Sequence, residues 1–94
     1  MRKVIDGKIY DTETAIKFRW ETMDRLKDIL GRTPPEFLHI NGHPTLYRTP
    51  NGNWFLAADR WNTIYKLTPD EALAILSATA PAEVCELYFD LEEA

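Results

Sequence analysis

The sequence predicts one α+β domain over residues 1–94, in which an antiparallel β-meander of four to five strands carries a short helix after the second strand and two short C-terminal helices on one face. Three observations lead to this prediction. Turn residues separate short runs that are rich in β-branched and aromatic residues, which is typical of strands joined by hairpins. A complete helix-start signal follows the last of these runs. With 94 residues, the chain can build only one thin core.

The clearest turn is Pro-Asn-Gly-Asn at residues 50–53, between two β-forming runs. Proline fixes φ, and Asn and Gly accept positive φ, so the segment predicts a β-hairpin over residues 45–58. Asp6 and Gly7 give a second signal of this kind. They predict either a tight hairpin near the N-terminus or a strand with a sharp turn.

Residues 15–22 allow two interpretations. Ile16, Trp20 and Met23 have the spacing of a helix face, whereas the segment also alternates strictly between apolar and polar residues. The alternation favours a strand, because a helix would leave Phe18 off its apolar face.

A short helix is then expected over residues 23–30, since Thr22 can cap it and Gly31 can end it. A further strand is expected over residues 63–67, after a loop at 59–62. These elements complete the meander before the C-terminal helices begin.

The two C-terminal helices are predicted from their start signals. Thr68 caps the first, which runs to about residue 78, with Pro69 at its first position and Glu71 completing a capping box. The second follows Pro81 and runs to about residue 89. Eight side chains are expected to bury the contact between these helices and the sheet: Leu73, Leu76, Val84, Leu87, Tyr88, Trp20, Phe55 and Ile64.

Charge divides the chain unevenly. Residues 1–66 hold all 11 Lys and Arg with 8 of the 15 acidic residues, whereas residues 67–94 hold seven acids and no Lys or Arg. Either the acidic helices are neutralised by a mildly basic sheet, or they form a face for a basic partner. Part of the acidity matches local helix chemistry, because Asp70 and Glu83 are expected in first helical turns.

The chemistry-bearing residues predict no catalytic, metal or cofactor site. Cys85 lies in an apolar stretch and is expected to be a buried structural thiol. His39 and His43 have metal-ligand spacing on a helix, but the Gly and Pro beside His43 argue against a helix there. Asp11 and Glu13 are expected to serve turn chemistry rather than acid–base catalysis.

The sequence also predicts a cytoplasmic location. No apolar run reaches the roughly 20 residues of a membrane-spanning helix, and the N-terminus lacks the apolar stretch of a signal peptide. A single cysteine leaves no internal disulfide, as is usual for proteins in a reducing compartment.

Three segments resemble a family of small uncharacterised proteins that are common in bacterial genomes, phages and mobile elements. The segments are DGKIYDTETA at 6–15, LYRT with GNWFL within 46–56, and LTPDEA at 67–72. Family members typically carry DGKxYDTETA, an LYRTxxGxWFL hairpin and an LTxEEA helix start, and the resemblance implies no established catalysis. Members often continue the hairpin into a Gly-rich loop, where this chain has AADRWN at 57–62.

Together these features lead us to expect a small non-enzymatic protein-binding module of phage or mobile-element type. It would occupy a basic surface of a larger host protein, and inhibition of a bacterial defence system, as anti-CRISPR proteins achieve it, is one instance. The expected contact residues are Arg60, Trp61, Asp70, Glu83, Glu86 and Asp90.

Two alternatives remain open at this point. One is a nucleic-acid-binding or regulatory protein whose basic sheet face includes Lys17 and Arg19, extended by Arg48 and Arg60. The net charge of −4 argues against it, since phosphate contacts dominate such affinity. The other is a housekeeping homodimer that pairs through an edge strand.

Overall fold

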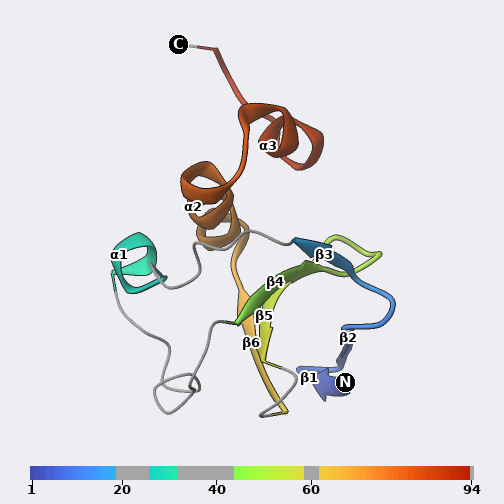
Figure 1. The fold of residues 1–94 in the computed structure, drawn as a ribbon. Coiled ribbons are helices and arrows are strands. Elements are labelled where there is room, and N and C mark those ends of the chain that lie inside the picture. Colours follow the sequence, from blue (N-terminus) through green and yellow to red (C-terminus); the bar gives the residue numbers. More distant parts are fainter. Residues whose placement is uncertain (19–25, 32–43, 59–61, 94) are drawn as a thin grey trace.

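The computed structural model describes residues 1–18, 26–31, 44–58 and 62–93. Its elements in chain order are β1 (Arg2–Ile5), β2 (Lys8–Asp11), β3 (Ile16–Phe18), α1 (Leu26–Leu30), β4 (Thr45–Arg48), β5 (Trp54–Ala58), β6 (Thr63–Leu67), α2 (Pro69–Thr79) and α3 (Ala82–Tyr88). β1 and β2 form a two-stranded sheet, and the other four strands form a sheet in the order β3-β4-β5-β6 (Figure 1). All pairings are antiparallel, so the predicted α+β class is confirmed. The structure differs from the prediction of four to five strands in one meander, because the first hairpin forms a sheet of its own; six strands are described, and α1 follows the third strand instead of the second.

The first hairpin, β1–β2, turns at Asp6 and Gly7. Both residues have positive φ, at 52° and 75°, as the tight two-residue turns of hairpins require. Ile5 pairs directly with Lys8 across the turn. Of the two predicted possibilities, the tight hairpin is therefore the correct one.

The β4–β5 hairpin has the predicted turn at residues 50–53. The amide of Gly52 donates to the carbonyl of Thr49 at 2.9 Å, and the amide of Thr49 donates to the carbonyl of Asn53 at 2.8 Å. Gly52 has a φ of 86°, and a Cβ there would lie 2.9 Å from a guanidinium nitrogen of Arg48. The positive φ of the turn is what favours glycine here, and a Cβ would in addition displace the end of the Arg48 side chain.

The predicted strand over residues 15–22 is confirmed where the structure describes it, at β3. Trp20, Thr22 and Met23 lie outside the described residues. α1 matches the second half of the predicted helix over 23–30, and Gly31 follows it with a φ of 78°, as expected of a glycine that ends a helix.

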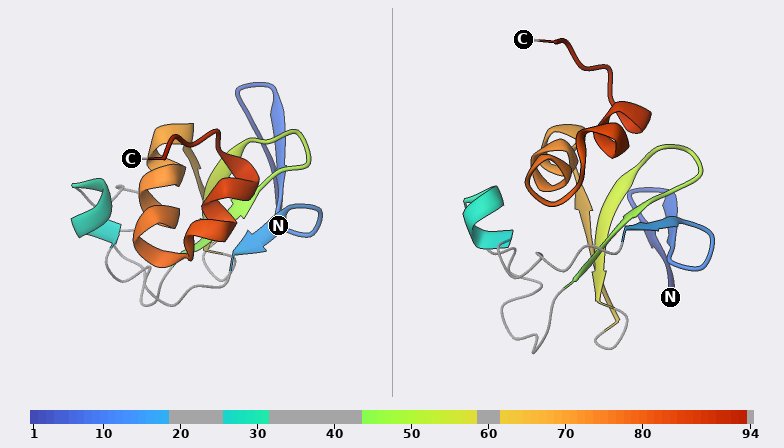
Figure 2. Two further views of the ribbon diagram at one scale, coloured as in Figure 1. Left: turned by 90° about the horizontal axis from the view of Figure 1, so that it is seen from above. Right: turned by 45° about the horizontal axis from the view of Figure 1, so that its top comes forward.

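β5 divides the core into two layers, because every one of its residues is buried. Trp54 and Leu56 point to the side that α2 and α3 cover, and these two helices lie side by side there (Figure 2). Phe55 and Ala57 point to the opposite side, where the first hairpin packs. The alternation of a strand thus supplies both layers from one segment.

The helix-side core contains ten buried residues: Phe18, Leu46, Trp54, Leu56, Ala58, Leu67, Ala72, Ile75, Leu76 and Cys85. The hairpin-side core contains five: Tyr10, Tyr47, Phe55, Ala57 and Ile64. Phe55 is central to the smaller core, since it stacks on Tyr47 at 5.1 Å between ring centroids and meets Tyr10 edge-on at 5.4 Å.

The predicted contact between helices and sheet is therefore correct in part. Leu76 is buried, and Val84 and Tyr88 pack against the helix-side core as expected. Phe55 and Ile64 do not join this contact, contrary to the prediction, because the first hairpin provides a second apolar surface on their side of the sheet.

Two further members of the predicted contact also differ. Leu73 is only half-buried, and Leu87 is 75 % exposed, because the inward face of α3 is formed by its other apolar residues. Trp20 lies outside the described part of the chain.

Aromatic rings and one guanidinium join α3 to the sheet. The guanidinium carbon of Arg48 lies 5.6 Å from the ring centroid of Trp54 and 5.2 Å from that of Tyr88. Trp54 also stacks on Phe89 at 5.3 Å. Such cation–π and stacked contacts add to the free energy gained from burial, so this cluster fixes which side of α3 faces the sheet.

Replacing Tyr88 by alanine should lower the free energy of unfolding by about 2 kcal/mol, because the rings of Trp54 and Phe18 and the guanidinium of Arg48 lose a contact. Urea denaturation followed by Trp fluorescence measures the change. Leu87→Ala is the control on the exposed side of the same helix and should change stability by less than about 0.5 kcal/mol. Equal losses in the two variants would contradict the assigned orientation of α3.

Replacing Thr68 by alanine should cost about 1 kcal/mol of stability, since its hydroxyl accepts a hydrogen bond from the Glu71 amide at the start of α2. Thermal unfolding followed by circular dichroism at 222 nm gives the change in melting temperature. Thr14→Ala, at an exposed threonine in the turn before β3, should leave that temperature nearly unchanged. A T68A variant as stable as the parent would show that the cap contributes nothing.

Candidate protein-binding face

The start of α2 explains part of the acidity of the C-terminal region. The Glu71 amide donates to Thr68 Oγ1 at 3.1 Å, and the Thr68 amide donates back to Glu71 Oε1 at 3.0 Å. The predicted capping box is thus confirmed, and Glu71 has a structural role. Asp70 stands beside it, exposed in the first turn, where the helix dipole favours a carboxylate.

α3 has two distinct faces. Cys85 is buried, and Val84 and Tyr88 are partly buried against the helix-side core. The opposite face is exposed and consists of Ala82, Glu83, Glu86 and Leu87. These positions fall on one side because residues three and four apart are neighbours on a helix.

The structure brings only some of the predicted contact residues together. Glu83 and Glu86 lie one turn apart on the exposed face of α3, and Asp90 is exposed just beyond its end. Asp70 is also exposed, but it lies in the first turn of α2, and Glu83 comes only after the other end of that helix. The 11 residues of α2 span about 16 Å, so Asp70 and Glu83 do not form one cluster.

Arg60 and Trp61, the predicted second contact, lie outside the described residues. Their role stays a prediction. The segment 57–62 replaces the Gly-rich loop of the resembled family. The structure describes Ala57, Ala58 and Asn62 of this segment.

Ion pairs among the described residues do not neutralise the acidic helices. The two that occur join Arg2 to Asp11, at 2.9 Å, and Lys66 to Asp6. Both belong to the first hairpin and its contact with the sheet. Three of the predicted contact residues accept no hydrogen bond and join no ion pair within the described ranges: Glu83, Glu86 and Asp90. Their carboxylates therefore remain available to a binding partner.

A small hollow adjoins this face, and no pattern in the sequence predicts it. It lies between α2, α3 and the C-terminal segment, has a volume of about 240 Å³, and is lined by Ser77, Ala80, Ala82, Cys85 and Leu91. Four of these side chains are small, which leaves the space. Leu91 is 43 % exposed and forms one wall.

Cys85 is buried and unpaired, which confirms the predicted structural thiol. In the part of the chain that the structure describes, no three His, Cys, Asp or Glu side chains lie close enough to hold a metal ion. His39 and His43 fall outside that part. No helix among the described residues is both long and apolar enough to cross a membrane.

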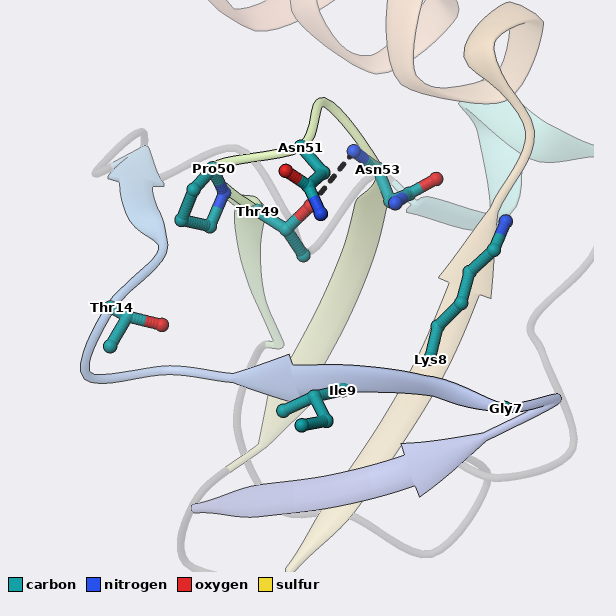
Figure 3. A pocket seen from close by; sticks show the side chains of 8 residues that line it. All are labelled: Gly7, Lys8, Ile9, Thr14, Thr49, Pro50, Asn51 and Asn53. Atoms are coloured by element: carbon teal, nitrogen blue, oxygen red, sulfur yellow. Dashed lines mark hydrogen bonds between the residues drawn. The ribbon is translucent and has the colours of Figure 1, made fainter.

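A larger hollow of about 660 Å³ lies between the first hairpin and the β4–β5 turn (Figure 3). Its lining comprises Gly7, Lys8, Ile9, Thr14, Thr49, Pro50, Asn51 and Asn53. One hydrogen bond crosses within it, from the Asn53 amide to Thr49 Oγ1 at 2.9 Å. Among the described lining residues, the groups that could take part in chemistry are the Lys8 amine and the hydroxyls of Thr14 and Thr49, and no carboxylate, histidine or cysteine accompanies them.

The basic sheet face that was considered for nucleic acid is not continuous. Lys17 pairs with Tyr47 on the side covered by the first hairpin, whereas Arg48 pairs with Ile16 and Trp54 on the helix side. Arg48 therefore cannot extend a patch around Lys17, contrary to that expectation. Arg19 and Arg60 lie outside the described residues.

Asp11 has the turn role that the sequence predicts. Its Oδ1 accepts the Glu13 amide at 2.9 Å, and its other oxygen accepts from Arg2. The hydrogen bond from the Glu13 amide, followed by that from Arg2, lowers the pKa of the Asp11 carboxyl. The pKa of Asp6 is lowered in the same direction, chiefly by its hydrogen bond with Lys66.

Acid should therefore weaken the first hairpin through Asp11. A carboxyl whose pKa is lower in the folded state stabilises the fold above its unfolded pKa, near pH 4, and this stabilisation is lost as the pH falls through the folded pKa. Urea midpoints measured between about pH 5 and 2 should fall less steeply in Asp11→Asn than in the parent. Asp90→Asn, at an exposed carboxylate without a described partner, serves as the control, and identical slopes in all three proteins would rule out the assigned role of Asp11.

Comparisons with protein-family models, with curated proteins and with solved structures gave no match to this chain. The family resemblance of its three segments therefore stays a prediction. What can be said of function comes from the exposed face of α3, the acids around it and the hollow beside it.

Proposed function

We propose that this chain is a small non-enzymatic protein-binding module, and that the exposed face of α3 with the segment after it docks on a basic surface of a larger protein. One observation carries the proposal: Leu87 is 75 % exposed on the same helix face as Glu83 and Glu86. An apolar side chain held in water beside acids that have no described partner is the composition of a docking surface.

The apolar part of this face can supply affinity. Leu87 and Leu91 both remain exposed, at 75 % and 43 %. Covering a fully exposed leucine yields about 1.5–3 kcal/mol, so the exposed parts of these two side chains together could contribute roughly a quarter to a half of the about 8 kcal/mol of a micromolar affinity. Single exposed leucines are common on soluble proteins. Here Leu87 directly follows Glu86 and Leu91 directly follows Asp90, so each exposed leucine adjoins an exposed acid, which is what makes the face a candidate.

The acidic part selects the partner. Residues 67–94 carry seven acids and no Lys or Arg, so the C-terminal region presents one sign of charge. A uniform field of this kind attracts a basic surface, speeds encounter and disfavours acidic competitors. The described ion pairs leave this field intact, because both involve other parts of the chain.

The form of activity that fits such a module is occupation of a host-protein surface. Inhibition of a bacterial defence protein with a basic surface, as anti-CRISPR proteins achieve it, remains the instance we favour. The support for this narrower role is the resemblance of the three segments to phage and mobile-element proteins, together with small size and acidity. This narrower role rests on analogy with other proteins, whereas the docking face rests on the exposed side chains of α3.

Charge reversal tests the docking face. Affinity capture from the native host, with mass spectrometry, identifies the partner, and its affinity is then measured for purified variants. E83K/E86K should bind at least about tenfold more weakly than the parent, because attraction becomes repulsion on the exposed side of α3.

The matched control is E13K/D28K, which changes the net charge equally at two exposed acids elsewhere. It should bind as the parent does, and circular dichroism should show that both variants are folded. If E83K/E86K keeps the parental affinity, or if both variants lose it equally, the docking face is not where we place it.

A further inference from the structure

We infer that the hollow between α2, α3 and the C-terminal segment receives one apolar side chain from a basic segment of the partner protein. This inference rests on the proposed function, since it names the chemistry of the partner at the same face. The inference adds one position at which an apolar side chain of the partner is buried. The protein should therefore prefer basic segments that contain such a side chain.

The hollow has the shape of an anchor site. Ala82 opens α3, and Cys85 follows one turn later as the buried floor. Ala80 and Ser77 come from the end of α2 and the residues after it, and Leu91 closes one side. The volume of the hollow is about 240 Å³, whereas one water molecule occupies about 30 Å³. The hollow is therefore large enough for one large aliphatic side chain.

The lining favours an apolar occupant over water. Among the described lining residues, Ser77 contributes a side-chain hydroxyl, and the others contribute two alanine methyls, a thiol and a leucine side chain. Water in such a space makes few hydrogen bonds, and an apolar group that displaces it gains affinity. Interfaces usually place their strongest contact in a pocket of this kind, with energetically weaker contacts around it.

Three exposed acids lie close in the chain to residues that line the hollow. Glu86 is four residues from Ala82, so the two are neighbours on the exposed surface of α3. Glu83 adjoins Ala82 in the chain, and Asp90 adjoins Leu91. A partner segment with an apolar anchor flanked by Lys or Arg would therefore satisfy both the hollow and its rim.

Two synthetic peptides test this preference. One has alternating Lys and Ser with a single central Leu, and the other has Ala in place of that Leu. Binding is measured by NMR titration of the full chain labelled at its alanine methyl groups. The Leu peptide should bind about tenfold more tightly, because its extra methyl and methylene groups are buried, and it alone should shift the Ala80 and Ala82 signals strongly.

Ala82→Leu fills the hollow at an exposed helix position and should abolish the preference for the Leu peptide while leaving the chain folded. Ala78→Leu makes the same change at an exposed position of α2 outside the lining and should keep the preference. A preference that survives in A82L, or that is lost equally in A78L, overturns the anchor site.

The outcomes also separate this inference from the function beneath it. If both peptides bind the parent equally and E83K/E86K loses both, the acidic face stands and the anchor site is wrong. If E83K/E86K binds both peptides as the parent does, the docking face itself fails. Sedimentation velocity tests whether a second copy of the chain occupies the hollow instead. If the parent is a dimer and A82L is a monomer, the hollow binds a second copy, and the inference of a basic partner segment is wrong.

Discussion

Burial of β5 on both of its faces is the constraint on which the rest of the structure depends. A strand with no exposed residue needs a cover on each side, and this chain supplies α2 and α3 for one and the first hairpin for the other. The described part of the sheet consequently has a covered apolar centre on each of its faces. A partner would therefore contact the outer surface of the helices and of the first hairpin. On that surface, α3 presents an exposed leucine beside two exposed acids.

The orientation of α3 follows from the same constraint. A helix of seven residues is too short to be stable alone, so tertiary contacts hold it. Trp54 comes from β5, and Tyr88 and Phe89 pack on its ring while Arg48 lies across Trp54 and Tyr88. Once that side faces the sheet, the opposite side must face water. The packing of Trp54 against Tyr88 and Phe89 thus places Glu83 and Glu86 on the solvent-exposed side of α3.

Local signals predicted most of the fold, and longer-range packing decided what they missed. The turn at 50–53 and the capping box at Thr68 depend on a few neighbouring residues, so they could be read directly. Trp54 and Phe55 are equally apolar, and only the position of the first hairpin tells which layer each enters. Leu87 was misassigned because a seven-residue helix allows more than one apolar stripe, and the hollow depends on how α2 and α3 are spaced.

The acids of the C-terminal region separate into two groups on physical grounds. Glu71 caps α2, and Asp70 and Glu83 lie in first turns, where the helix dipole favours them. Glu86 lies toward the other end of α3 and Asp90 follows it, where a carboxylate is unfavourable by about 0.3–1 kcal/mol, and neither helix has a basic residue in its last turn. Folding alone would favour Lys or Arg at these positions. Acids that stabilise neither helix lie beside an exposed leucine and an apolar hollow, and the binding that we propose would account for them where the fold does not.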